Sequence, residues 1–142
     1  MRSFLLSVTP LLVALGVVGV ATAAFADQDT PFTQNGVTAV CTGVGSAKDN
    51  PEWAAYPIKL VLANSAGENL AAAHFRVTRG GATVLETDCD APWLLVKAPP
   101  GQYTATALVG EASRSTSFTA GNGPQKELTL MFGGGRRQAS AQ

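Results

Sequence analysis

The chain has 142 residues, with ten basic side chains, ten acidic side chains and one histidine, and 46% of its residues are hydrophobic. This length suits one domain with one modest core and leaves no room for a second. The balanced charge excludes the basic footprint that binding to nucleic acid or to an anionic membrane requires.

The first 26 residues predict an export signal. Arg2 supplies a positive start, Phe4 to Val20 is almost wholly apolar, and Ala24-Phe25-Ala26 matches the small-x-small cleavage pattern. We expect cleavage after Ala26, with Ala21-Thr22-Ala23 as a second candidate site. Because Arg2 is the only charged residue removed, nine basic and ten acidic side chains would remain.

A membrane anchor is the alternative interpretation of this segment. It is disfavoured because Pro10 interrupts the apolar run and no charged stop follows it. A lipid anchor is also not expected, because the first cysteine is Cys41, far from the cleavage point. The sequence therefore predicts a periplasmic or secreted protein with no stable membrane anchor after cleavage.

Cys41 and Cys89 are the only cysteines. In an exported chain they indicate one disulfide, because the compartment beyond the inner membrane is oxidising. Two free buried thiols or a metal pair are the alternatives. A metal is disfavoured because His74 is the only imidazole and no Cys-x-x-Cys spacing occurs. No metal and no cofactor are expected.

The first third of the mature chain predicts a loose start, a strand, a loop and a short helix. Residues 27–35 are polar and form a flexible lead-in. The Gly-containing stretch 42–47 indicates a turn, since two glycines are too weak a signal for a phosphate cradle. Asn50 caps a short helix with Pro51 in its first position and Glu52 in its first turn.

Alternating apolar residues bounded by turn signals predict short strands along the rest of the chain. They are expected over 36–41, 58–64, 70–79, 82–87, 93–96, 103–109, 113–119 and 127–132. Residues 113–119 are rich in Ser and Thr, which suits a sheet edge or a wet face. The final stretch, 133–142, predicts a flexible Gly-rich tail.

The stretch from 88 to 110 carries the strongest local pattern. The apolar run 93–96 and the alternating run 103–109 flank Pro99-Pro100-Gly101, which predicts a β-hairpin. Pro100 and Gly101 suit the two central positions of a type II turn. Tyr103 opens the second strand, where its ring can cover the end of a core and its hydroxyl can reach the backbone.

Together these elements predict one all-β domain over 36–132, a sandwich of about seven strands with Greek-key connections and one short helix. The predicted core consists of Ile58, Leu60, Leu62, Phe75, Val77, Val84, Trp93, Leu95, Tyr103, Ala105, Ala107, Val109, Leu128 and Leu130.

Several residues invite a functional role and a structural one. His74 falls on the solvent side of its strand, where a lone histidine is most simply a surface residue. Asp88 and Asp90 flank Cys89 and could form an acid-base or metal pair, but no further ligands lie near them in sequence. The aromatic residues Trp53, Tyr56 and Trp93 are candidate ligand contacts, or else core and rim packing.

Four motifs resemble the exported bacterial proteins called carboxypeptidase regulatory-like domain proteins. They are Tyr56-Pro57-Ile58-Lys59-Leu60-Val61, the stretch from Asn69-Leu70 through Val77-Thr78, Asp90-Ala91-Pro92-Trp93-Leu94 and Pro99-Pro100-Gly101-Gln102-Tyr103-Thr104. The Pro-Pro-Gly-x-Tyr motif also resembles transthyretin-like and collagen-adhesin B-type modules. The resemblance implies a prealbumin-like sandwich, export and no assigned chemistry.

The two cysteines depart from that family pattern. Cys41-Thr42-Gly43-Val44-Gly45 stands where a Gly-Gly-Val-Gly stretch is common, and Cys89 precedes the turn motif where a cysteine is unusual. If the two loops meet at one end of the sandwich, a bridge explains both cysteines.

We therefore expect a non-catalytic exported accessory or binding module of the bacterial envelope that recognises a protein or a glycan. A small periplasmic hydrolase of transthyretin-like type is one alternative. It is disfavoured because such enzymes use several histidines and a Tyr-Arg-Gly-Ser-like end, and because no Gly-x-Ser-x-Gly elbow occurs. A purely structural envelope protein is the other alternative, which the sequence does not separate from a binding module.

Overall fold

The computed structural model describes residues 27–133. The predicted signal segment, 1–26, and all but the first residue of the predicted tail lie outside the described residues. The described part folds into nine strands and two short 3-10 helices. These are β1 (Phe32–Gln34), β2 (Val37–Thr42), η1 (Gly45–Asp49), η2 (Pro51–Ala55), β3 (Ile58–Asn64), β4 (Ala73–Arg79), β5 (Ala82–Cys89), β6 (Trp93–Lys97), β7 (Gly101–Val109), β8 (Ala112–Ala120) and β9 (Lys126–Phe132).

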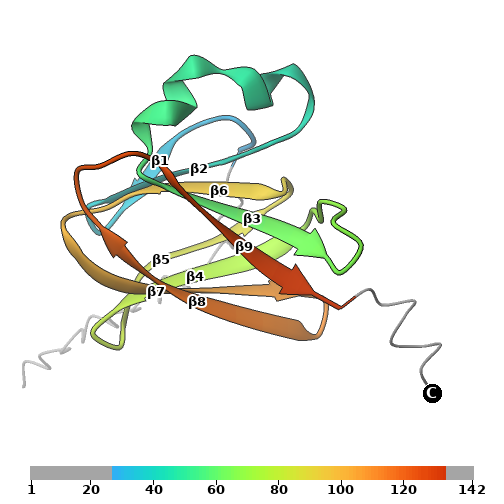
Figure 1. Ribbon diagram of the computed structural model, residues 1–142. Helices are drawn as coiled ribbons and strands as arrows, with labels where there is room; N and C mark the ends of the chain where they lie inside the picture. Colours follow the sequence, from blue (N-terminus) through green and yellow to red (C-terminus); the bar gives the residue numbers. More distant parts are fainter. Residues whose placement is uncertain (1–26, 134–142) are drawn as a thin grey trace, which may run out of the picture.

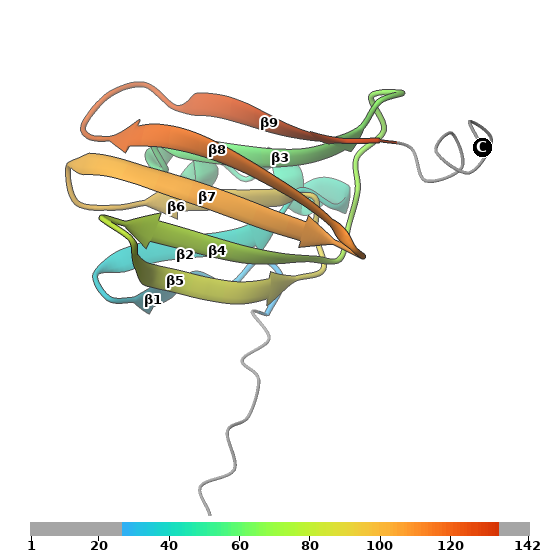
Figure 2. The same ribbon diagram turned by 90° about the horizontal axis from the view of Figure 1, so that it is seen from below.

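The strands form two sheets, in agreement with the predicted all-β class (Figure 1). The first sheet has the order β1-β2-β6-β3-β9 and the second has the order β5-β4-β7-β8, which Figure 2 shows from the side of the second sheet. All neighbours are antiparallel except β3 and β9, which run parallel.

The main core fills the space between the two sheets, because every second side chain of each strand points inward. Nine predicted core residues are buried there: Ile58, Leu60, Leu62, Phe75, Val77, Tyr103, Ala105, Ala107 and Leu130. Val109 and Leu128 are only partly buried and pack against its rim.

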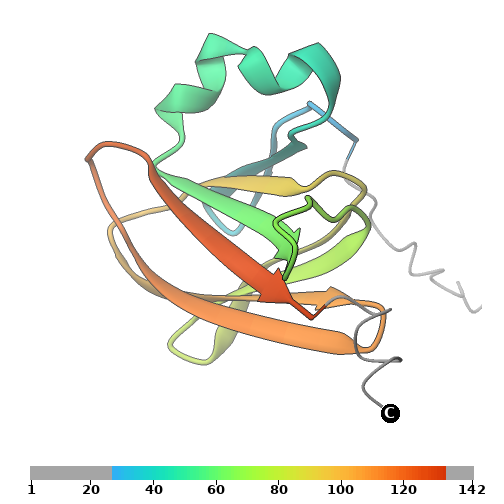
Figure 3. The same cartoon turned by 45° about the vertical axis from the view of Figure 1, so that its right-hand side comes forward.

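The helices η1 and η2 lie over the outer face of the first sheet (Figure 3). They cover a second, smaller cluster formed by Val40, Trp53, Tyr56 and Leu95. Asn50 caps η2 as predicted, because its side chain accepts a hydrogen bond from the Glu52 backbone N–H at 3.0 Å. The glycine-containing loop predicted at 42–47 includes the start of η1.

The predicted hairpin between 93–96 and 103–109 is wrong. β6 lies in the first sheet and β7 in the second, so the turn around Pro100 carries the chain across the core from one sheet to the other. Gly101 has φ 152°, whereas the third residue of a type II turn needs a φ of about +80°. Turn residues between two apolar runs signal a reversal, but they do not say whether the two runs pair with each other.

The predicted core was wrong in register at β6. Leu94 and Val96 point into the main core, while Trp93 and Leu95 point to the opposite face of the sheet. Both faces of this strand are covered, so its sequence is apolar throughout and carries no alternation to mark the inner face.

Two further corrections concern β5 and the lead-in. Leu85, not Val84, is fully buried, because the pairing of β4 with β5 shifts there and leaves Val84 without an opposite residue. The predicted flexible lead-in contains β1, which pairs with β2 through a turn at Asn35 and Gly36. Both residues have positive φ, as an Asn-Gly hairpin turn requires.

Candidate functional site

The predicted disulfide between Cys41 and Cys89 is confirmed. Both residues lie in strands and not in loops. Cys41 is in β2 of the first sheet and Cys89 ends β5 of the second, with their Cα atoms 5.7 Å apart. Both are buried in the main core. The bridge therefore ties the two sheets together through the core, and it leaves no thiolate among the described residues.

The outer face of the second sheet carries a cluster of Ser and Thr side chains that are exposed or half-buried. Strand register places side chains in rows across β4, β7 and β8, for example Thr78, Thr104 and Ser117 in one row. We call the following set the hydroxyl face: Thr78, Thr104, Thr106, Ser113, Ser115, Ser117 and Thr119. Because successive side chains of a strand point to opposite faces of the sheet, the period-two pattern of the sequence creates this surface.

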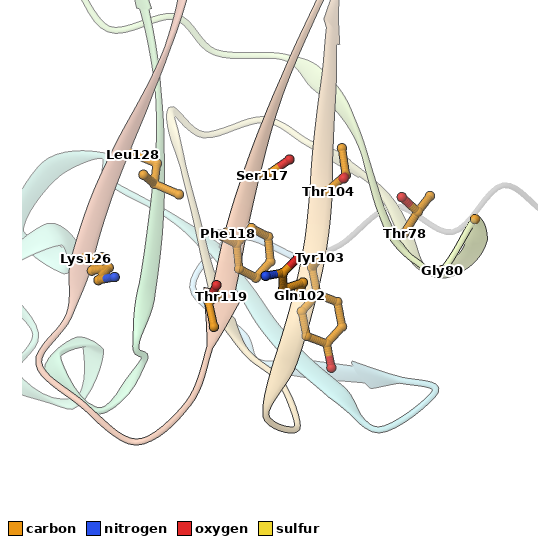
Figure 4. A pocket seen from close by; sticks show the side chains of 11 residues that line it. Thr78, Gly80, Gln102, Tyr103, Thr104, Ser117, Phe118, Thr119, Lys126 and Leu128 are labelled. Carbon is orange, nitrogen blue, oxygen red and sulfur yellow. The ribbon is translucent and has the colours of Figure 1, made fainter.

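A shallow depression of about 580 Å³ crosses one end of this face. Figure 4 shows the side chains that line it, which come from β4, β7, β8 and β9. Its polar side chains are Thr78, Gln102, Thr104, Ser117, Thr119 and Lys126. Tyr103 and Phe118 also line it, but they are 3% and 6% exposed and belong to the core, where their rings stack at 5.4 Å.

The opposite corner of the same face holds a charged network. His74 binds Asp88 through Nδ1 at 2.7 Å and Glu86 through Nε2 at 2.8 Å. Arg76 Nη2 donates to the same Glu86 oxygen at 2.9 Å. The register explains the arrangement, because His74 lies opposite Asp88 and Arg76 opposite Glu86.

This network shifts two pKa values in opposite directions. The hydrogen bond to Glu86, followed by that to Asp88, raises the pKa of His74. The hydrogen bond from His74, followed by that from Arg76, lowers the pKa of Glu86. Both ring nitrogens of His74 face carboxylates, so neither is free to accept a proton from a nucleophile. The arrangement is that of a surface ion-pair network.

Asp88 and Asp90 do not act together as the carboxylate pair that the sequence analysis considered and disfavoured. Asp88 contacts His74, whereas Asp90 is exposed in the turn that follows β5. Within residues 27–133, no three His, Cys, Asp or Glu side chains come close enough together to hold a metal ion.

Two of the three aromatic candidates for ligand contact, Trp53 and Tyr56, are buried. Trp53 is 6% exposed, and its Nε1 donates to the Ala47 carbonyl at 2.7 Å. Tyr56 is 8% exposed and meets the Trp53 ring edge-on at 6.0 Å. Burial, with a smaller contribution from Glu52, raises the pKa of Tyr56. These rings hold η2 on the sheet and leave little area for a ligand.

Trp93 is half-buried on the outer face of the first sheet. The Lys59 ammonium lies 3.5 Å from its ring centroid. Gly43 approaches the ring so closely that an added Cβ would lie 2.7 Å from Trp93 Cγ. Trp93 is thus covered on two sides and separated by both sheets from the hydroxyl face.

The polar residues of the depression were not among the predicted site residues. The Ser and Thr of 113–119 did signal a wet surface. No sequence signal showed that Thr104 and Thr78 lie beside them, because this depends on which strands are neighbours.

No helix within residues 27–133 has both the length and the apolar character needed to span a membrane. The chain matches no protein-family model. No curated protein matches it either.

Proposed function

We propose that this protein is a non-catalytic accessory module of the bacterial envelope that binds a protein or a glycan on the hydroxyl face. In this proposal the chain is exported and processed after Ala26, and its fold is a Greek-key sandwich of the prealbumin-like class. The inter-sheet disulfide supports export, because such bridges persist in oxidising compartments. The repeated crossing of the chain between the sheets supports the Greek-key class.

The observation that carries the proposal is the set of free polar groups in the depression. Among the described residues, the side chains of Gln102, Thr104, Ser117 and Thr119 have no hydrogen-bond partner. By contrast, the neighbouring hydroxyls of Thr106 and Ser115 bond to each other at 2.8 Å. Uncharged donors and acceptors on a concave surface suit the hydroxyl groups of a glycan or the polar edge of a protein.

A rigid support favours binding on this face over binding on a loop. The depression lies on paired strands, so its polar groups keep their spacing without a cost of ordering. The Lys126 ammonium at one end is its only charged group. We therefore expect recognition of a neutral or weakly acidic surface.

Affinity capture with matched variants tests the proposal. The oxidised protein from 27 to 142 is probed on a glycan array and used to capture partners from native envelope extract. Thr104→Glu/Ser117→Glu places two charges in the depression, and Thr129→Glu places one on the outer face of the first sheet. We expect the double variant to lose the bound glycan or protein and Thr129→Glu to keep it. Equal retention by both variants would contradict the proposal.

A further inference from the structure

The two sheets end in four edge strands, and three of these edges are blocked. β1 has only three residues. β9 begins with Lys126 and Glu127, and its Met131 carbonyl accepts a hydrogen bond from Arg114 Nε at 3.0 Å. Short length, edge charges and occupied backbone groups all discourage the pairing of an edge with another chain.

The β5 edge is blocked by side chains that imitate a strand. Gln34 Nε2 donates to the Glu86 carbonyl at 3.0 Å, and Gln34 Oε1 accepts from the Glu86 N–H at 3.0 Å. Asn35 Nδ2 donates to the Val84 carbonyl at 2.9 Å. The bulge at Val84 and the charges of Glu86 and Asp88 add to this protection.

The β8 edge has fewer of these devices: one of its outward carbonyls, that of Ser113, is occupied by the Arg114 guanidinium, and β9 approaches the strand on one side. It is nine residues long and pairs with β7 without a register shift from Ala112 to Ala120. It contains no proline, and its only charged residue is Arg114. The Arg114 guanidinium is turned toward β9 and its own strand, where it donates to the carbonyls of Met131 and Ser113.

The geometry of the hairpin fixes which backbone groups of β8 face the open edge. The two-residue turn Gly110-Glu111 closes on the pair Val109 and Ala112, and in such a turn the closing pair is a hydrogen-bonded one. Every second residue after Ala112 therefore bonds to β7. The N–H and C=O groups of the residues between them point outward: Ser113, Ser115, Ser117 and Thr119.

These four residues make the edge complementary to itself. If a second β8 ran antiparallel about a two-fold axis at Thr116, Ser115 would face Ser117 of the other copy and Ser113 would face Thr119. The outward backbone groups would then be paired, once the Arg114 guanidinium releases the Ser113 carbonyl. On the hydroxyl face every facing pair of side chains would be two hydroxyls, while Arg114 would face Phe118 on the inner side of the sheet. The bond between Thr106 and Ser115 shows that such a pair forms on this sheet, at 2.8 Å.

We propose that two copies of this protein join through β8 to form one continuous eight-stranded sheet. The partner strand would lie beside Ser117 and Thr119, at the end of the depression that β9 also lines. The outward side chains of β4 and β7 would stay open on both copies. Natural edge strands often carry charged side chains that repel a second copy. No like charges would meet along the β8 edge. The proposal is independent of what the hydroxyl face binds.

Sedimentation equilibrium of the oxidised protein from 27 to 142, over micromolar to millimolar concentrations, tests the pairing. We expect a reversible monomer–dimer equilibrium for the wild type. Ser115→Pro removes an outward N–H without removing a bond to β7, so it should weaken the dimer at least tenfold. Ser115→Ala keeps the backbone and should dimerise like the wild type. A wild type that stays monomeric to 1 mM would overturn the proposal.

A charge exchange tests the register and does not depend on proline. Ser115→Lys/Ser117→Lys and Ser115→Glu/Ser117→Glu should each be monomeric, because like charges would face each other. A mixture of the two should form a heterodimer, whose mass is read by native mass spectrometry. Dimers that persist in either variant alone, with folding confirmed by circular dichroism, would show that another surface is used and would also overturn the proposal.

Discussion

The Tyr103 hydroxyl donates a hydrogen bond to the Pro99 carbonyl at 2.7 Å, across the turn that joins the two sheets. Arg79 Nη1 donates to the same hydroxyl at 3.3 Å, and its Nη2 donates to the Pro100 carbonyl at 3.3 Å. A side chain at the start of β7 thus holds the end of the preceding loop, and the chain crosses between the sheets with a fixed geometry.

Tyr103→Phe should lower the free energy of unfolding by about 1 to 2 kcal/mol, because both hydrogen bonds of the hydroxyl are lost while the ring keeps its place in the core. Tyr103→Ala should cost about 3 to 5 kcal/mol, since it also removes the ring that stacks on Phe118. Urea unfolding followed by Trp fluorescence measures both changes. An equal loss in the two variants would mean that the hydroxyl, and not the ring, supplies the stability.

Removing the inter-sheet bridge should destabilise the fold. In Cys41→Ala/Cys89→Ala we expect a loss of about 3 to 4 kcal/mol, because a constraint across 48 residues disappears from the unfolded chain. Reduction of the wild type with dithiothreitol should bring its urea midpoint close to that of the variant. Thiol labelling of the denatured, unreduced wild type provides the control. Two labelled thiols would contradict the bridge.

Gly43 should be intolerant of any side chain. It has φ 110°, and a Cβ would lie 2.7 Å from the Trp93 ring. Gly45 also has positive φ, at 63°, but nothing lies near its added Cβ. Gly45→Ala should therefore cost about 1 kcal/mol of backbone strain, and Gly43→Ala more, with a shift in Trp fluorescence. If the two variants unfolded at the same urea concentration, the contact with Trp93 would have no energetic weight.

The His74 network should make stability depend on pH within a defined window. The pKa of His74 is raised in the folded protein. Its contribution to the free energy of unfolding is therefore fully present below pH 6.5, the ordinary pKa of histidine, and is lost as the pH rises through the folded-state pKa. The pKa of Glu86 is lowered, so its contribution is present above 4.5 and is lost as the pH falls through its folded-state pKa. Both contributions are therefore present between these two values.

His74→Gln should destabilise the protein more at pH 5.5 than at pH 8.5. The difference should be below about 1 kcal/mol, because the network is partly exposed and screened by solvent. Unfolding in urea at the two pH values, at low salt, measures it. Arg76→Gln serves as the control, since its charge does not change in this range. A larger loss of stability from His74→Gln at pH 8.5 than at pH 5.5 would contradict a raised pKa of His74 in the folded protein.

The all-β class and the approximate strand positions were predictable from the sequence because each depends on local signals. The disulfide was predictable for another reason, since the chain has only two cysteines to pair. The alternation of Phe75 and Val77 with His74 and Arg76 defines a strand with one wet face. The cap at Asn50 and the turn residues divide the chain at the correct places. These signals need only the residues on either side.

The order of the strands within each sheet could not be predicted in the same way. Nothing local distinguishes a turn that pairs 93–96 with 103–109 from one that sends the chain across the core. The buried face of Trp93–Lys97 was also undetermined, because η2 covers the side that would otherwise be polar. The depression on the hydroxyl face depends on these same relations, which explains why its residues were missed.

Photo-crosslinking in the bacterial envelope tests most directly whether the hydroxyl face binds a partner. A photoreactive benzophenone side chain is placed at Gln102, in the depression, or at Thr129, on the outer face of the first sheet, in the 142-residue chain that includes the predicted export signal. We predict a discrete crosslinked product, larger than two copies of this chain, from position 102 and none from position 129. A product from position 129 alone, or none from either position, would contradict the proposal.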